Sequence, residues 1–179
     1  MSIEVTTRAG LIAIARLAVA DAVHGRLTER AAVDNVPQAS GVFVTLKKNG
    51  ELRGCIGTLA CRQPLVEEIA RVAVSAARED PRFPPVTAAE IAELVFEVSV
   101  LGPLERIDPL HPDSITIGRH GLVVEQGWRR GLLLPQVAPE WRWTRDEFLA
   151  HTCRKAGLPP DAWRRGADVY RFEAVVFGD

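Results

Sequence analysis

The stretch GVFVTLKKNGELRGCIGT, residues 41 to 58, predicts a β-hairpin. Its two halves are rich in apolar and β-branched residues, which favour strands. Asn49-Gly50 between them tolerates the positive φ angles that a two-residue hairpin turn requires. Counting outward from that turn pairs Val44 with Cys55, and Arg53 then shares a face with Cys55 because side chains alternate along a strand.

The second half of this hairpin raises a question, because glycine weakens strands and two glycines flank one cysteine. Gly54 and Gly57 either let another part of the chain pack closely or let a ligand approach Cys55. Cys55 itself is either a buried structural residue, as free cysteines often are, or a reactive group. Arg53 favours the second interpretation, since a nearby permanent cation stabilises a thiolate.

Helices and strands alternate irregularly in the rest of the chain. Apolar residues at helical spacing predict a helix that ends at His24-Gly25, and Pro64 opens a second one. Capping boxes predict further helices after Thr87 and Thr144. Apolar and β-branched residues predict strands over residues 94–101, within 114–127 and 131–137, and over 168–177. This pattern indicates an α+β fold, with a mostly antiparallel or mixed sheet flanked by helices.

Length and composition describe an ordinary globular chain. Its 179 residues are enough for one domain, and we find no linker or repeat, so we expect a single domain over residues 1–179. The formal net charge is −1, although residues 119–171 carry 10 basic against 6 acidic side chains. Nucleic-acid binders usually concentrate positive charge more strongly, so this balance argues against a nucleic-acid partner.

The cysteines and the N-terminal residues bear on location. Cys55, Cys61 and Cys153 are odd in number and widely spaced, which is typical of a reducing compartment. The N-terminal residues have no signal-peptide pattern, and no apolar run approaches the ~20 residues needed to cross a bilayer. We therefore expect a cytoplasmic protein without a membrane partner.

Few other residues carry a motif for catalysis. Cysteine and histidine spacings match no metal site, and glycine-rich phosphate loops are absent, so we expect neither metal nor cofactor. His120, beside Gly121, either shapes a turn or acts as a base toward Cys55. Asp80 pairs with Arg53, pairs with Arg82, or locks the end of the preceding helix. Glu97 lies mid-strand, where a solvated position is commoner than a catalytic one.

Four tryptophans are interleaved with arginines in the second half of the chain. Such residues form a stacking surface for a nucleobase, cover a pocket, or anchor one part of the domain to another. Of these interpretations the anchoring role is the most common. The four residues are Trp128, Trp141, Trp143 and Trp163.

Six segments together resemble the AMMECR domain family, whose bacterial members are called AmmeMemoRadiSam system protein A. The hexamer LRGCIG, residues 52–57, is the hallmark of that family, and the resemblance covers nearly the whole chain. The other five segments are DPRFPPVTAAEI (80–91), VSVLGPLERI (98–107), IGRHGLVV (117–124), LLLPQVAPEW (132–141) and FLAHTCRKAGL (148–158).

The resemblance implies a compact α+β domain in which a smaller helical portion packs beside the main sheet. It also implies an enzyme-like cleft around the hexamer and an association with Memo-like and radical-SAM proteins. Combined with the residue patterns, it suggests a small-molecule enzyme with Cys55, Arg53 and His120 as catalytic residues. Gly54, Gly57, Asp80 and Arg82 would then bind the substrate.

Two alternatives stay open, namely a non-catalytic module that binds the Memo-like or radical-SAM partner and a weak nucleic-acid binder. The sequence leaves the reaction, the substrate and the oligomeric state open.

Overall fold

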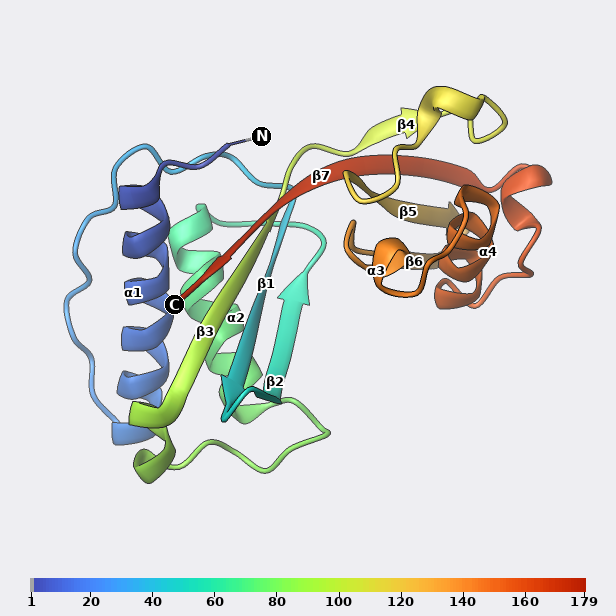
Figure 1. Cartoon of the computed structure of the whole chain (residues 1–179). Helices are drawn as coiled ribbons and strands as arrows, with labels where there is room; N and C mark the ends of the chain where they lie inside the picture. Colours follow the sequence, from blue (N-terminus) through green and yellow to red (C-terminus); the bar gives the residue numbers. More distant parts are fainter. Residues whose placement is uncertain (1) are drawn as a thin grey trace. The chain divides into compact units, whose positions relative to one another are not determined.

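The computed structural model describes residues 2–179, which divide into two compact units (Figure 1). The first unit consists of residues 2–101 and 175–179, and the second consists of Gly102–Ala174. The expectation of a single domain over the whole chain stays a prediction.

The first unit is a three-stranded antiparallel sheet with two helices on one face. Its strands lie in the order β2-β1-β3, so β2 is an edge strand. Figure 1 shows α1 and α2 side by side against this sheet, and a 3₁₀ helix leads into β3. The elements are α1 (Val5–His24), β1 (Gly41–Lys48), β2 (Glu51–Thr58), α2 (Leu65–Arg78), the 3₁₀ helix Ala88–Glu93 and β3 (Leu94–Leu101).

Local signals in the sequence place the ends of these elements. Gly25 ends α1 in the left-handed conformation at φ 64°, where glycine has no steric penalty. Pro64 directly precedes α2, and Thr87 forms the expected capping box with Glu90. The helix ends and the hairpin turn predicted from sequence are thus confirmed in this unit.

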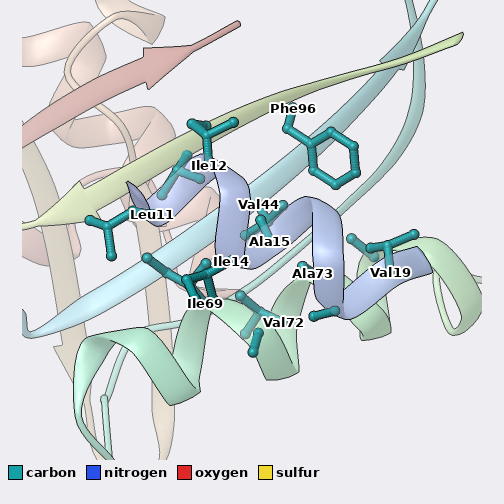
Figure 2. Packing of buried hydrophobic residues seen from close by; sticks show 14 of the residues in the cluster. Leu11, Ile12, Ile14, Ala15, Val19, Val44, Ile69, Val72, Ala73 and Phe96 are labelled. Atoms are coloured by element: carbon teal, nitrogen blue, oxygen red, sulfur yellow. The ribbon is translucent and has the colours of Figure 1, made fainter. Parts of the chain in front are cut away.

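The core of the first unit lies between the sheet and its two helices. The side chains of Val42, Val44 and Leu46 alternate along β1 toward the helices and have no exposed surface. Figure 2 shows Val44 and Phe96 among apolar side chains of α1 and α2. Each such side chain contributes about 1.5–3 kcal/mol through its removal from water. One face of this sheet is therefore committed to the core, and β1 presents Thr45 and Lys47 on the other.

A β-bulge in the hairpin corrects the predicted register. The turn at Asn49-Gly50 is present, but the pairing shifts between Leu46 and Lys47, and Arg53 is the extra residue. Cys55 therefore pairs with Thr45 and not with Val44. The count from the turn was wrong beyond this point because it assumed an unbroken ladder, and a bulge moves all later pairs by one residue.

The second unit is also a mixture of antiparallel strands and helices. Its strands lie in the order β4-β7-β5-β6, and β7 continues into residues of the first unit. A separate core packs α4 against this sheet. The elements are β4 (Glu105–Ile107), β5 (His120–Gln126), β6 (Arg129–Leu133), α3 (Val137–Glu140), α4 (Arg145–Lys155) and β7 (Asp168–Gly178), with 3₁₀ turns at Pro112–Ser114 and Ala162–Arg164.

The predicted α+β class is confirmed, since the strand pairs within each unit are antiparallel and helices flank the strands. Within residues 2–179, no helix combines the length and the apolar composition needed to cross a membrane.

Candidate functional site

Cys55 lies on the face of the first-unit sheet that the helices leave open. Its cross-strand neighbour Thr45 sits between two buried residues of β1 and therefore points away from the helices. The hydroxyl of Thr45 donates a hydrogen bond to Sγ of Cys55 over 3.3 Å, and the thiol is half-buried. The sulfur is thus held by a polar neighbour and is not sealed in the core.

The open edge of β2 is covered at Cys55 by the side chains of Asp80 and Arg82. The backbone N–H of Cys55 donates to Oδ2 of Asp80 over 2.9 Å, and Nη2 of Arg82 donates to the Cys55 carbonyl over 3.4 Å. The two side chains also form an ion pair of 2.7 Å. These hydrogen bonds use the backbone N–H and carbonyl of Cys55 that would otherwise pair with a further strand. They also hold this part of the edge strand in place.

The buried carboxyl of Asp80 is strongly held in its ionised form. Hydrogen bonds from the Arg82 guanidinium, followed by those from the backbone of Cys55 and Arg82, hold its pKa well below the ordinary value, against the opposing effect of burial. Of the alternatives left open for Asp80, the structure selects the pair with Arg82. Asp80 and Arg82 are therefore near Cys55, as predicted, but contact its backbone.

Arg53 points to a different partner from the one expected. Its guanidinium makes a two-pronged pair with Glu90, with N–O distances of 2.9 and 3.1 Å, and a third bond of 2.9 Å to the Pro84 carbonyl. This hydrogen-bonded pair lowers the pKa of Glu90 to about 2. Arg53 thus fastens the segment before β3 to the bulge, which corrects the expected pairing of its guanidinium with the Cys55 thiol.

The two glycines of the hexamer are required for packing. A Cβ atom on Gly54 would lie 2.2 Å from the carbonyl oxygen of Ala76, so the backbone of α2 rests directly on this residue. A Cβ on Gly57 would lie 2.3 Å from the ring of Phe43, its partner across the hairpin. The structure therefore accounts for both glycines without a ligand, and their predicted role in substrate binding stays a prediction.

His120 begins β5 in the second unit and is only 8% exposed. Its Nδ1 accepts a hydrogen bond from the backbone N–H of Thr116 over 3.0 Å, which closes the turn before the strand. Burial, followed by the charges of Arg171 and Arg119, lowers the pKa of this histidine, so its neutral form is favoured. The turn-shaping role is thus observed, and the role of base toward Cys55 stays a prediction.

Two residues lie in line with Cys55 on the open face, namely Thr45, which the sequence reasoning missed, and Glu97, which it considered without a link to Cys55. Thr45 pairs with Cys55 on one side and with Glu97 on the other, so the three residues form a row across β2, β1 and β3. Glu97 also binds Lys47, with Nζ 2.9 Å from Oε2. We call Cys55, Thr45 and Glu97 the cross-strand row. Only the true register, with its bulge, could have revealed it.

The remaining cysteines lie elsewhere. Cys153 is buried in the core of the second unit, and Cys61 follows β2 and is half-buried. Burial and the nearby carboxylate of Glu68 raise the pKa of the Cys61 thiol. Among residues 2–179, no three His, Cys, Asp or Glu side chains gather as a metal site would require.

Comparisons with known proteins identify relatives over most of the chain. A protein of Methanothermobacter thermautotrophicus is 48% identical over 176 residues, which cover 93% of this chain and 91% of that protein. Protein MJ0810 of Methanocaldococcus jannaschii is 52% identical over 144 residues, covering 76% and 72% of the two chains.

A solved structure, that of the uncharacterized protein PH0010 from Pyrococcus horikoshii, matches with a TM-score of 0.81 and 44% identity. The match covers 94% of this chain and 89% of the other. The model of the AMMECR1 family matches residues 12–177. On this evidence, the chain belongs to the AMMECR1 family.

Proposed function

We propose that this protein is an enzyme that uses Cys55 as a nucleophile toward a small electrophilic molecule. The observation that carries the proposal is the cross-strand row. It places a half-buried thiol, a hydroxyl bonded to its sulfur and a carboxylate on one open sheet face. A thiol, an orienting hydrogen bond and a nearby carboxylate are the components that nucleophilic catalysis requires.

The spacing of the row suggests where a substrate would lie. Neighbouring strands are about 4.8 Å apart, so a molecule placed over Thr45 would reach Cys55 on one side and Glu97 on the other. That span fits a small carbonyl compound. Lys47 holds the Glu97 carboxylate beside this position through their ion pair.

The proposed step is addition of the thiol to the carbonyl group. Sγ of Cys55 forms a bond to the carbonyl carbon, and the π pair of the C=O bond moves to its oxygen. The thiol proton passes to that oxygen by way of solvent on the open face and the carboxylate of Glu97, which lies two strands from Cys55, so the product is a hemithioacetal and no oxidant is needed. Asp80 and Arg82 support this step by holding the Cys55 backbone at the strand edge.

Alkylation of the folded protein with iodoacetamide, followed by mass spectrometry of the labelled peptides, tests the site. We expect Cys55 to be labelled first and Cys61 only at higher pH, because the pKa of Cys61 is raised. Thr45→Val should slow the labelling of Cys55, Thr45→Ser should restore it, and Cys61→Ser should leave it unchanged.

Incubation with a mixture of small carbonyl metabolites tests the chemistry. Intact-mass measurement under non-denaturing conditions, without a reducing agent, should show an added mass on the wild type and not on Cys55→Ser. A Cys55 that is protected from labelling while the protein is folded would refute the proposal. Full function of Cys55→Ser in the cell would instead favour a non-catalytic module that binds Memo-like or radical-SAM partners.

A further inference from the structure

A three-ring aromatic stack lies on the surface of the second unit, which contains none of the residues of the proposed reaction. The rings of Trp143 and His151 are nearly parallel, with centroids 3.8 Å apart and an interplanar angle of 6°. Trp141 stacks on Trp143 at 6.1 Å and 20°. Trp143 packs against the core of the unit, whereas Trp141 is 68% exposed. The stack therefore runs from the core outward and ends in an exposed indole.

The backbone between the two tryptophans adopts a conformation that few residues tolerate. Arg142 has a φ of 55°, in the left-handed region, and follows the short helix α3. The N–H of Arg142 bonds to the Pro139 carbonyl, and that of Trp143 bonds to the Ala138 carbonyl. This is the helix-ending motif that usually has glycine at the left-handed position. The left-handed conformation of Arg142 turns the backbone so that Trp141 stacks on Trp143. Non-glycine residues in strained conformations are concentrated at functional sites.

The outer face of Trp141 is available to a ligand. Within residues 2–179, Trp143 is the one ring that stacks on Trp141, and the Trp141 side chain keeps 68% of its surface exposed. Exposed tryptophans gain most from stacking with flat rings, because both partners remove apolar surface from water. The end of the stack is thus a platform for one more planar ring.

The charges around this platform indicate which ring it would accept. Arg142 directly follows Trp141, and its side chain forms no ion pair in the described part of the chain. Nη1 of Arg154 lies 3.3 Å from Nε2 of His151, the ring that stacks on Trp143. Glu140 precedes Trp141, so the local excess of positive charge is moderate. A planar ring that carries an anionic group would satisfy both the indole and the arginines.

We propose that Trp141, supported by Trp143 and His151, binds a nucleobase, with the attached phosphate beside Arg142. This chemistry is shared by a free mononucleotide and by a single strand of RNA. The site is independent of Cys55, and it gives a use to the tryptophans and arginines that the proposed reaction leaves unexplained. Of the other tryptophans, Trp163 is buried in the core of the second unit, and the role of anchoring one part of the domain to another stays a prediction.

Proton NMR of the ligand tests this proposal. Stacking on an indole should move the adenine protons of adenosine 5′-monophosphate upfield when the protein is added. Adenosine should bind more weakly, and ribose 5-phosphate should not bind, because it lacks the ring. A short oligoadenylate that binds far more tightly than the mononucleotide would identify single-stranded RNA as the source of the ligand, and equal affinities would identify the nucleotide.

Four variants separate the platform from the rest of the surface. Trp141→Ala should weaken binding about tenfold or more, the range measured for loss of one base–aromatic stack, and Trp141→Phe should retain most of it. Arg142→Gly should weaken the binding of adenosine 5′-monophosphate but not the binding of adenosine. Trp128→Ala is the matched control, since this tryptophan is 89% exposed in the turn between β5 and β6.

The platform would be refuted by unchanged nucleotide binding in Trp141→Ala or by an equal loss in Trp128→Ala. It would also be refuted if ribose 5-phosphate bound as well as the nucleotide, or if the wild type caused no upfield shift. Circular dichroism of each variant distinguishes loss of the site from loss of the fold.

Discussion

Substitution of Gly54 by alanine tests the packing of α2 on the hexamer strand. The new Cβ would lie 2.2 Å from the Ala76 carbonyl oxygen, whereas an ordinary contact begins at 3.4 Å, so about 1.2 Å of overlap must be relieved. The obstructing atom belongs to the main chain of a helix and cannot rotate away. Relief therefore requires α2 and β2 to separate.

The expected cost follows from two opposing effects. Overpacking of this kind costs about 1–3 kcal/mol and occasionally more, and a rigid main-chain obstacle places Gly54→Ala at the upper end. The alanine also makes the unfolded chain less flexible than glycine does, which stabilises the folded protein by about 0.4–1 kcal/mol. The free energy of unfolding should therefore fall by about 2 kcal/mol, which lowers the melting temperature by about 4–8 °C for a chain of this size.

Urea denaturation followed by circular dichroism measures this change, and Gly10→Ala is the matched control. Gly10 lies inside α1, and its new Cβ would meet the Val33 side chain at 3.0 Å, which can move because it is not backbone. Alanine is favoured over glycine in helices by about 1 kcal/mol, so this variant should be neutral or slightly more stable. A Gly54→Ala protein as stable as the wild type would refute the packing argument.

Three further predictions concern charge and backbone strain. Asp80→Asn should destabilise the protein at neutral pH, and the difference should shrink progressively as pH falls below about 4. The stability that the lowered pKa of Asp80 contributes is fully present above its unfolded value of 3.8 and is lost as pH falls toward the lower pKa of the folded protein. Urea titrations across pH measure it, and a difference that stays constant as pH falls below 3.8 would contradict this. The lowered pKa of His120 means that its protonation opposes folding, so stability should fall below about pH 6.5, and less so in His120→Gln, in the same assay. Arg142→Gly should raise the unfolding free energy by about 1 kcal/mol, since glycine relieves the left-handed strain, and an unchanged or lower value would count against that strain.

The local structure of this chain could be predicted from short-range signals. Asn49-Gly50 marked the hairpin, Gly25 ended α1, and Thr144 with Glu147 capped α4, because each signal depends on backbone conformations that neighbouring residues impose. The LRGCIG hexamer likewise indicates the family from six consecutive residues. These features need no knowledge of distant contacts.

The surroundings of Cys55 could not be predicted in the same way. The bulge at Arg53 depends on the distant Glu90 and Pro84, which draw the guanidinium away from the thiol. Because of this one extra residue, the neighbour of the Cys55 sulfur is Thr45 and not the expected Val44. The sulfur therefore lies beside a hydrogen-bond donor and not beside an apolar side chain. Sequence reasoning placed Cys55 on the correct strand but paired it with the wrong residue of β1.

The amino-acid sequence alone therefore determined most of the helices and strands and the family to which the chain belongs. It missed β4, and it extended the strand expected at 131–137 beyond Leu133 to residues that begin α3. Tertiary structure decided which side chains meet: Asp80 and Arg82 at the edge of β2, Thr45 and Glu97 across the sheet, and Trp141 on Trp143. The physical reason is range. Turn, cap and alternation preferences act over a few residues, whereas ion pairs, a bulge and ring stacking depend on groups that only the folded chain brings together.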